Sequence, residues 1–193
     1  MDFLELVTGA RTCRRFREAE GMPAGMLDWL IACARVTPCG GNAQALRFAV
    51  AEPPEACAAV FPVLKWAGML TDWDGPEAGE RPTGYVAILG EAGTRAKLNA
   101  IDAGIAAQTI QLAAYTRDLG CCIFLSFDPR KIREVLGIPE NLEPLLVLAL
   151  GFQKEVRRVE TVGADGSVKY WRDAQGVHHV PKRPLEDLLI IKK

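Results

Sequence analysis

The chain has 193 residues, of which 49% are hydrophobic, so it is long enough for one sizeable core and short for two independent domains. Its 23 basic and 24 acidic residues are well mixed and leave a formal net charge of −1, which argues against a nucleic-acid-binding face. No apolar run approaches the roughly 20 residues of a membrane span, and the first residues carry acids where a secretion signal would be basic. We therefore expect a cytoplasmic, single-domain protein with no nucleic-acid or membrane partner.

Helical and extended patterns alternate along the first half of the chain. In chain order they predict a helix capped by Asp2 and ended by Gly9, a helix begun at Pro23 and stopped by Pro38, a strand over 46–51, and a helix over 55–64. The stretch 66–82 that follows is irregular, and its glycines, prolines and two tryptophans indicate a lid or a dimer-contact segment.

The second half begins with the elements expected to form most of the core. These are a strand over 85–89, the longest helix over 98–119 closed by Gly120, a strand over 121–125, a helix over 129–136 begun after Asp128, and a strand over 144–150. The strand over 144–150 is apolar on both faces, which predicts a central position in the sheet. Strands separated by helices favour an α/β arrangement.

The C-terminal segment 155–193 differs from the rest. A turn at residues 164–166 is expected to join two short alternating segments that end near Trp171. The segment has too few apolar residues for a core of its own, so we expect it to pack on something else, such as a partner subunit. If it lies across another subunit, the sheet becomes mixed.

Several catalytic arrangements are excluded by the sequence. The two serines, Ser126 and Ser167, do not lie in a Gly-x-Ser-x-Gly turn, and neither a Walker loop nor the Gly-x-Gly-x-x-Gly dinucleotide fingerprint is present. The two histidines are adjacent in a segment that reads as a strand, so one of them should point outward and a catalytic base is not supported. We nominate no catalytic residue.

The six cysteines are expected to be reduced thiols. A zinc site would need Cys13, Cys39, His178 and His179 to converge, and none of them belongs to a spaced ligand pair. We therefore expect no metal, and small buried thiols are the simpler interpretation.

Three polar motifs remain as candidates for binding. Residues 11–16 read Arg-Thr-Cys-Arg-Arg-Phe and suit an anion, because arginine forks bind phosphate oxygens in pairs; the alternative is a solvated basic turn. Residues 37–44, Thr-Pro-Cys-Gly-Gly-Asn-Ala-Gln, combine a flexible backbone with two amides that could match the edge of a flavin ring, or they form an ordinary loop. Residues 181–185 hold two cations for the same anion, or make a basic turn.

The order of these motifs resembles the nitroreductase family. Residues 11–16 are similar to its arginine-serine-x-arginine-arginine-aromatic opening, and residues 37–44 to its Pro-Ser-x-x-Asn-x-Gln loop. Residues 101–108 resemble the family's central dimer helix, residues 119–122 its glycine turn into a strand, and residues 147–151 its late strand. The resemblance extends over nearly the whole chain.

The resemblance implies an α+β fold with a mixed central sheet flanked by helices, an interlocked homodimer, and FMN in two interface sites. By position, one subunit would hold the phosphate and ribityl chain through Arg11, Thr12 and either Arg14 or Arg15. Lys182 and Arg183 would close the phosphate site. The strand end at Leu125 and Ser126 would lie beside the reactive edge of the ring. The loop residues that match those reaching the flavin of the other subunit are Cys39, Gly40, Gly41, Asn42 and Gln44.

The sequence departs from the family pattern in four places. Ala10 replaces a frequent additional arginine, Cys39 a serine and Ala45 a proline, and Ala103 stands where one branch of the family often has histidine. A looser or differently tuned flavin site is therefore expected.

The resemblance implies an NAD(P)H-dependent FMN oxidoreductase that reduces a flat, electron-poor acceptor such as a nitroaromatic, a quinone or a flavin. The chain would comprise one nitroreductase-like domain over 1–193, with 155–193 as an extension on the partner. Candidates for shaping the substrate slot are Trp66, Met69, Trp73 and Tyr85. The alternatives are an FMN storage or sensor protein without turnover, and a deiodinase-like or flavin-modifying member of the same fold.

Overall fold

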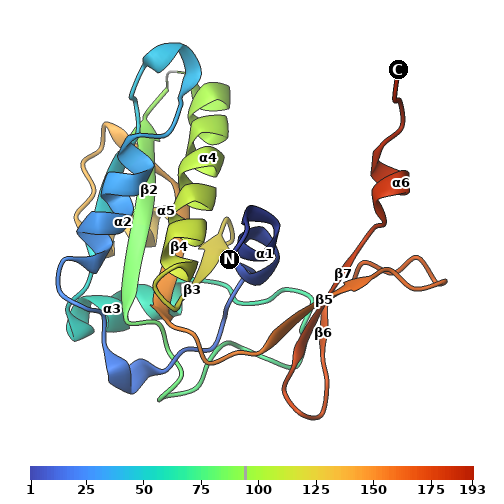
Figure 1. The fold of residues 1–193 in the computed structure, drawn as a ribbon. Coiled ribbons are helices and arrows are strands. Elements are labelled where there is room, and N and C mark those ends of the chain that lie inside the picture. Colours follow the sequence, from blue (N-terminus) through green and yellow to red (C-terminus); the bar gives the residue numbers. More distant parts are fainter. Residues whose placement is uncertain (94) are drawn as a thin grey trace.

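The body of the protein is a four-stranded sheet covered by helices on both faces (Figure 1). The computed structural model describes residues 1–93 and 95–193. The strands of the sheet, in the spatial order β1-β2-β4-β3, are β1 (Arg47–Ala51), β2 (Gly84–Glu91), β4 (Leu142–Phe152) and β3 (Leu119–Phe124). The helices around it are α1 (Phe3–Gly9), α2 (Met26–Arg35), α3 (Pro54–Val60), α4 (Ala96–Tyr115) and α5 (Pro129–Leu136). The observed fold is α+β.

The two central strands explain the continuous apolar runs in the sequence. Val86 and Ile88 of β2 face α2 and α4, while Tyr85, Ala87 and Leu89 face α3 and α5. Strand β4 alternates in the same way, and the residues over 146–150 are all buried. The prediction of a central strand apolar on both faces is therefore confirmed.

Local capping signals set most helix ends. Asp2 accepts a hydrogen bond from the Glu5 backbone in a reciprocal capping box, and Asp128 accepts from the first turn of α5. Several predicted helix boundaries are wrong; the helix expected over 55–64, for example, spans Pro54–Val60. Two of the errors have a local cause. Helix α2 begins at Met26 and not at Pro23, because Gly25 adopts a left-handed conformation with φ of 72°. Helix α4 ends at Tyr115, since Asp118 turns the chain with φ of 60°.

The N-terminal link 10–16 runs along strand β3. The Cys13 N–H donates to the Cys121 carbonyl at 2.9 Å, and Thr12 pairs with Cys121 in a parallel bridge. Phe16 is fully buried against the sheet. This placement requires Gly120, because a Cβ there would lie 2.5 Å from Cys13 Sγ. The close contact between Gly120 and Cys13 also positions the neighbouring residues of the link, which include Arg11 and Arg14.

Replacing Gly120 with alanine should therefore destabilise the protein. The added methyl would collide with Cys13, and overpacking of a close contact costs typically about 1 to 3 kcal/mol. Chemical denaturation measures the free energy of unfolding. Gly163→Ala serves as the control, because its Cβ would come no closer than 3.4 Å to another described residue. Equal stabilities of the two variants would contradict the role assigned to Gly120.

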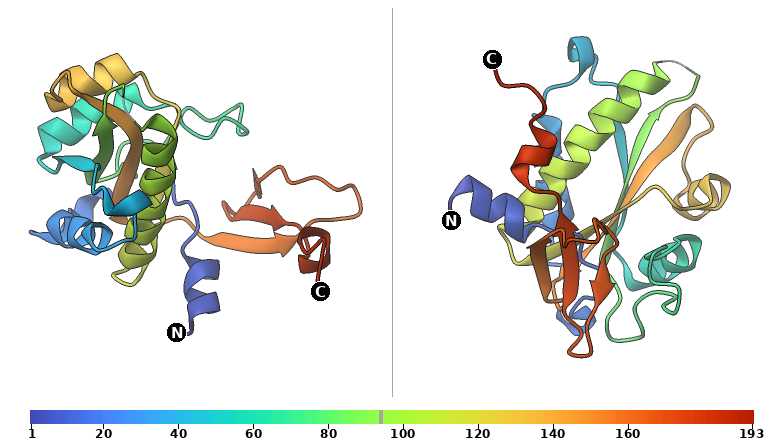
Figure 2. Two further views of the ribbon diagram at one scale, coloured as in Figure 1. Left: turned by 90° about the horizontal axis from the view of Figure 1, so that it is seen from above. Right: turned by 90° about the vertical axis from the view of Figure 1, so that its right-hand side faces the viewer.

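The C-terminal segment forms a second, smaller sheet that projects from the body (Figure 2). Its strands are β5 (Arg157–Thr161), β6 (Trp171–Arg172) and β7 (His178–Lys182), and helix α6 (Leu185–Leu188) follows. Strand β7 lies in the middle, parallel to β5 and antiparallel to β6. The turn at Gly163–Gly166 exists, but the segments it joins do not pair with each other, because β7 inserts between them.

The central sheet differs from the mixed sheet that was expected. Within one chain each of the four strands is antiparallel to its neighbours, and the Thr12 to Cys121 bridge supplies a parallel contact at the edge. The prediction depended on a strand from another subunit, which a single chain does not contain.

None of the described helices is long and apolar enough to cross a membrane.

Candidate cofactor site

A pocket of about 300 Å³ lies between the N-terminal link, helix α4 and the C-terminal sheet. It brings together four of the predicted phosphate-binding residues, namely Arg11, Thr12, Arg14 and Lys182. The other lining residues are Gln111, Tyr170, His178 and Val180. Residues from the two ends of the chain therefore meet in one place, as the sequence motifs predict.

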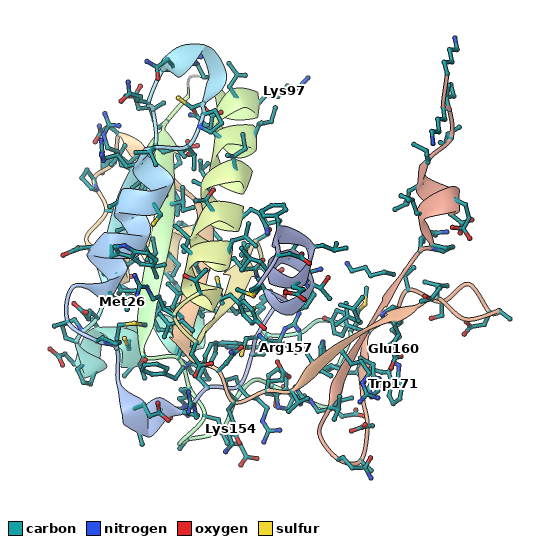
Figure 3. All side chains as sticks on the ribbon, in the orientation of Figure 1. Met26, Lys97, Lys154, Arg157, Glu160 and Trp171 are labelled. Carbon is teal, nitrogen blue, oxygen red and sulfur yellow. The ribbon has the colours of Figure 1, made fainter. Side chains whose placement is uncertain are left out.

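The charges of this pocket are positive. Its lining includes two arginines and one lysine, and no carboxylate among the described residues. Among residues 1–93 and 95–193, Arg11 forms no salt bridge; its guanidinium reaches only the Ala10 carbonyl, at 3.4 Å. Arg157 of β5, labelled in Figure 3, lies where the C-terminal segment leaves the body. It holds the Arg11 backbone by donating to its carbonyl at 2.9 Å. An anion is the natural complement of such a lining.

Two predicted phosphate ligands lie outside the pocket. The Arg15 guanidinium is paired with Glu80, which also binds Lys154 at 2.8 Å. The hydrogen bond from Arg15 lowers the pKa of Glu80 to about 2, so this carboxylate stays ionised and keeps the pair together. Arg183 is exposed and does not line the pocket. Arg15 is excluded for a geometric reason, because adjacent residues of an extended link point to opposite sides.

A second pocket, of about 150 Å³, adjoins the first through shared walls. Arg14 and Tyr170 line both pockets. Here they meet Leu125 and Ser126, which follow the end of β3 as predicted, and the exposed Lys65. The Lys65 N–H donates to the Ser126 carbonyl at 2.9 Å, so the strand end is fixed by the neighbouring loop. We call the two pockets, which share Arg14 and Tyr170 as walls, the cationic tract.

The loop with Cys39, Gly40, Gly41, Asn42 and Gln44 lies elsewhere. It packs at the start of α4, where the Gly40 N–H donates to Asp102 Oδ1 at 3.0 Å. Cys39 and Gln44 line a different pocket of about 550 Å³ beside α2 and β1. Asn42 and Gln44 both have positive φ, 51° and 49°, a strained arrangement that is common at functional loops. Within one chain this loop accepts hydrogen bonds from Arg47 and Arg95, but it does not line the pocket of Arg11 and Arg14.

The prediction that one of the paired histidines points outward is wrong. His178 is 1% exposed and His179 6% exposed, on opposite faces of the small sheet. His178 faces Tyr170, with ring centroids 5.1 Å apart, and His179 stacks on Trp171 at 4.0 Å. Both faces are covered because β7 is the central strand and aromatic side chains pack on each side.

His179 stabilises the small sheet in a pH-dependent way. Its ring nitrogens meet Asp173 at 3.1 Å and Glu160 at 2.5 Å, which raises its pKa. A raised pKa means that the proton stabilises the fold fully below about pH 6.5, and that this contribution is lost as pH rises through the folded-state pKa. The difference in melting temperature between wild type and His179→Gln should therefore shrink from pH 6 to pH 8.5. A constant difference would contradict this.

Most of the aromatic residues suggested for the substrate slot serve in packing. Trp66 is buried against Phe61 and Phe124, and Tyr85 is buried in β2. Trp73 packs edge-on against Trp66. Met69 is 46% exposed, and its N–H donates to the Tyr170 hydroxyl. The segment 66–82 thus binds the C-terminal sheet of its own chain.

Sequence reasoning missed Gln111, Tyr170, His178 and Lys65 as residues lining the two pockets. The available signal for Tyr170 and His178 was that aromatic residues recur in a polar segment without a core of its own.

Among the described residues, no group of three or more histidine, cysteine or acidic side chains could hold a metal ion. Burial raises the pKa of Cys13 to about 11 and that of Cys122 to about 12, so both are neutral thiols.

Known structures share this fold. A nitroreductase family protein from Clostridium difficile is 24% identical, with a TM-score of 0.64 over 81% of this chain and 87% of that one. A Staphylococcus epidermidis protein named as an NAD(P)H:FMN oxidoreductase is 17% identical, with a TM-score of 0.69 over 100% of this chain and 95% of that one. Iodotyrosine deiodinase bound to FMN and 3-iodo-L-tyrosine is 19% identical, with a TM-score of 0.64 over 78% and 89%.

No curated protein sequence matches the chain significantly. The model of the nitroreductase family matches residues 7–152, which include α2, the whole central sheet and the N-terminal arginines. The motifs identified in the sequence, the fold and this match agree, and the chain belongs to the nitroreductase family.

Proposed function

We propose that the protein is an FMN-dependent oxidoreductase that transfers electrons from NAD(P)H to a small, flat, electron-poor acceptor. The observation that carries the proposal is the cationic pocket formed by Arg11, Thr12, Arg14 and Lys182. Two relatives of the same fold support the choice of cofactor, because one is named as an NAD(P)H:FMN oxidoreductase and the other is bound to FMN.

The residues of the pocket fit a terminal phosphate. Arg11 and Arg14 present guanidinium donors, Lys182 adds a point charge and Thr12 a hydroxyl. A phosphate monoester would offset their charges, which no carboxylate of the described lining does. The sequence has no glycine fingerprint for a dinucleotide, so FMN is favoured over FAD.

The second pocket suits the ring end of the same molecule. When bound, FMN supplies the two-electron chemistry that couples oxidation of NAD(P)H to reduction of the acceptor. Arg14 and Lys65 place positive charge beside Leu125 and Ser126, where they would attract the electron-rich edge of a flavin. The protein contributes binding, orientation and charge, and this function requires no nucleophilic side chain.

The proposed assembly is a homodimer in which residues 155–193 pack on the partner. Apolar side chains that are half or more exposed cluster at the C-terminus: Leu185, Leu188, Leu189, Ile190 and Ile191. Ile101 on α4 is 51% exposed as well. Exposed apolar clusters of this kind mark contact surfaces. In such a dimer the loop at residues 39–44 would complete the site of the partner, which explains its distance from Arg11 within one chain.

The test begins with the purified protein. It should be yellow, and denaturation should release FMN; released FAD would contradict the proposal. Under anaerobic conditions NADH or NADPH should bleach the flavin, whereas a storage or sensor protein would leave it oxidised. Iodide release from 3-iodo-L-tyrosine by the reduced protein would favour the deiodinase-like alternative. Sedimentation should show a dimer, and a monomeric holoprotein would contradict the proposed assembly.

A further inference from the structure

Arg14 is held by three groups that come from the C-terminal part of the chain. Its backbone N–H donates to Glu155 Oε2 at 2.9 Å. Its guanidinium carbon lies 4.9 Å from the centroid of the Tyr170 ring, and its terminal nitrogen lies 3.4 Å from His178 Nε2. Arg14 itself lines both halves of the cationic tract. The small sheet therefore fixes the direction of an arginine that belongs to the N-terminal motif.

The contact with His178 forms only when the imidazole is neutral. A guanidinium has donors and no acceptor, so Nε2 must accept and the ring proton must reside on Nδ1. Nδ1 is buried, lies 4.0 Å from Glu155 Oε1, and has no hydrogen-bond partner within the described residues. A second proton on the ring would turn Nε2 into a donor and place it against the guanidinium.

The surroundings of His178 oppose that second proton. Arg14 faces it from the N-terminal link, Arg157 from β5 and Arg172 from β6, while Glu155 is the carboxylate nearby. Glu155 is also engaged by Arg172 at 2.6 Å. Burial, with a further contribution from the three arginines, lowers the pKa of His178 below its usual value near 6.5. Near neutral pH the ring is therefore free to accept from Arg14.

We propose that neutral His178 is a positioning residue that holds Arg14 toward the anion of the cofactor, and that protonation of His178 releases Arg14 and weakens binding. This inference rests on the proposed FMN site. It differs from direct ligation of the phosphate by His178, because a protonated imidazole acting as a ligand would strengthen binding at low pH. The two roles thus predict opposite pH dependences.

The first experiment needs no cofactor. The chain has two histidines, so two imidazole Hε1 signals are expected in an NMR titration of the apoprotein, and His179→Gln leaves the Hε1 signal of His178 alone. His178 should titrate below pH 6.5. Arg14→Ala in the same background should raise the pKa of His178, since it removes an adjacent cation. An unchanged pKa would overturn the Arg14 to His178 contact on which the proposal depends.

The second experiment titrates the apoprotein with FMN at pH 7.5 and at a pH one unit below the pKa of His178 that the first experiment measures. At pH 7.5 His178→Leu should bind about tenfold more weakly than wild type, because the acceptor is lost, whereas His178→Gln should bind nearly as well. Between these two pH values wild type should lose more affinity than His178→Gln. The loss of affinity in His178→Gln reports the titration of the phosphate itself. His179→Gln is the matched control, since its ring faces the other side of the sheet.

The outcomes separate this inference from the proposed function. If wild type binds no FMN at any pH, the proposed function is wrong and the inference falls with it. If wild type binds FMN and His178→Leu binds equally well, or if wild type loses no more affinity at the lower pH than His178→Gln does, the function stands and the positioning role is overturned. Melting temperatures of the variants identify any loss of affinity that comes from unfolding alone.

Discussion

Replacing Arg11 with alanine is expected to weaken FMN binding at least about tenfold. The Arg11 guanidinium lines the cationic pocket and is not paired with a carboxylate among the described residues, so its charge is available to a phosphate. A hydrogen bond to a charged group contributes on the order of 1.5 to 3 kcal/mol, and about 1.4 kcal/mol corresponds to tenfold in affinity. The preceding residue, Ala10, carries no charge that could substitute for Arg11. Fold and assembly should be unchanged.

The matched control is Arg15→Ala, which removes the same charge four residues further along the link. Arg15 is bound to Glu80 and does not line the pocket, so its loss should leave FMN affinity within about threefold of wild type. Fluorescence titration of apoprotein with FMN measures both variants. Equal losses, or a greater loss for Arg15→Ala, would show that the motif is assigned one position out of register.

Ending the chain after Val162 is expected to abolish FMN binding, with a loss of about a hundredfold or more. The truncation removes Lys182 from the pocket, and it removes Tyr170 and His178, which hold Arg14. Removing two charge-assisted hydrogen bonds to the phosphate together weakens binding by roughly 3 kcal/mol or more. The body should still fold, because neither core cluster contains a residue beyond Phe152 among the described residues.

A shorter truncation separates the pocket from the assembly. Ending the chain after Arg183 keeps every residue of the pocket and removes the exposed apolar residues of α6 and the segment that follows it. This variant should retain phosphate contacts but shift toward the monomer in sedimentation, and circular dichroism should confirm the fold of both truncated chains. If the chain of 162 residues bound FMN as tightly as wild type, the C-terminal sheet would have no part in the site.

Much of the fold was visible in the sequence because it depends on near neighbours along the chain. The Asp2 capping box, the stop at Gly9, the cap at Asp128 and the apolar run of β4 each act within a few residues. The predicted helix start at Pro23 and helix stop at Gly120 were wrong, because other residues of the same short segments set the boundaries. Proline suits a first helical turn and glycine suits a helix end, but here Gly25 and Asp118 adopt the left-handed conformations that set the boundaries.

The sequence also predicted which distant residues share a cationic pocket, since Arg11, Thr12, Arg14 and Lys182 meet in one place. It could not determine that Arg15 pairs with Glu80, 65 residues away, or that Arg14 meets His178, 164 residues away. Those contacts arise where β7 inserts between β5 and β6 and where the N-terminal link packs along β3. Only the tertiary structure decided them, because periodicity and capping describe a residue's chain neighbours, whereas distant pairs form through the packing of whole elements.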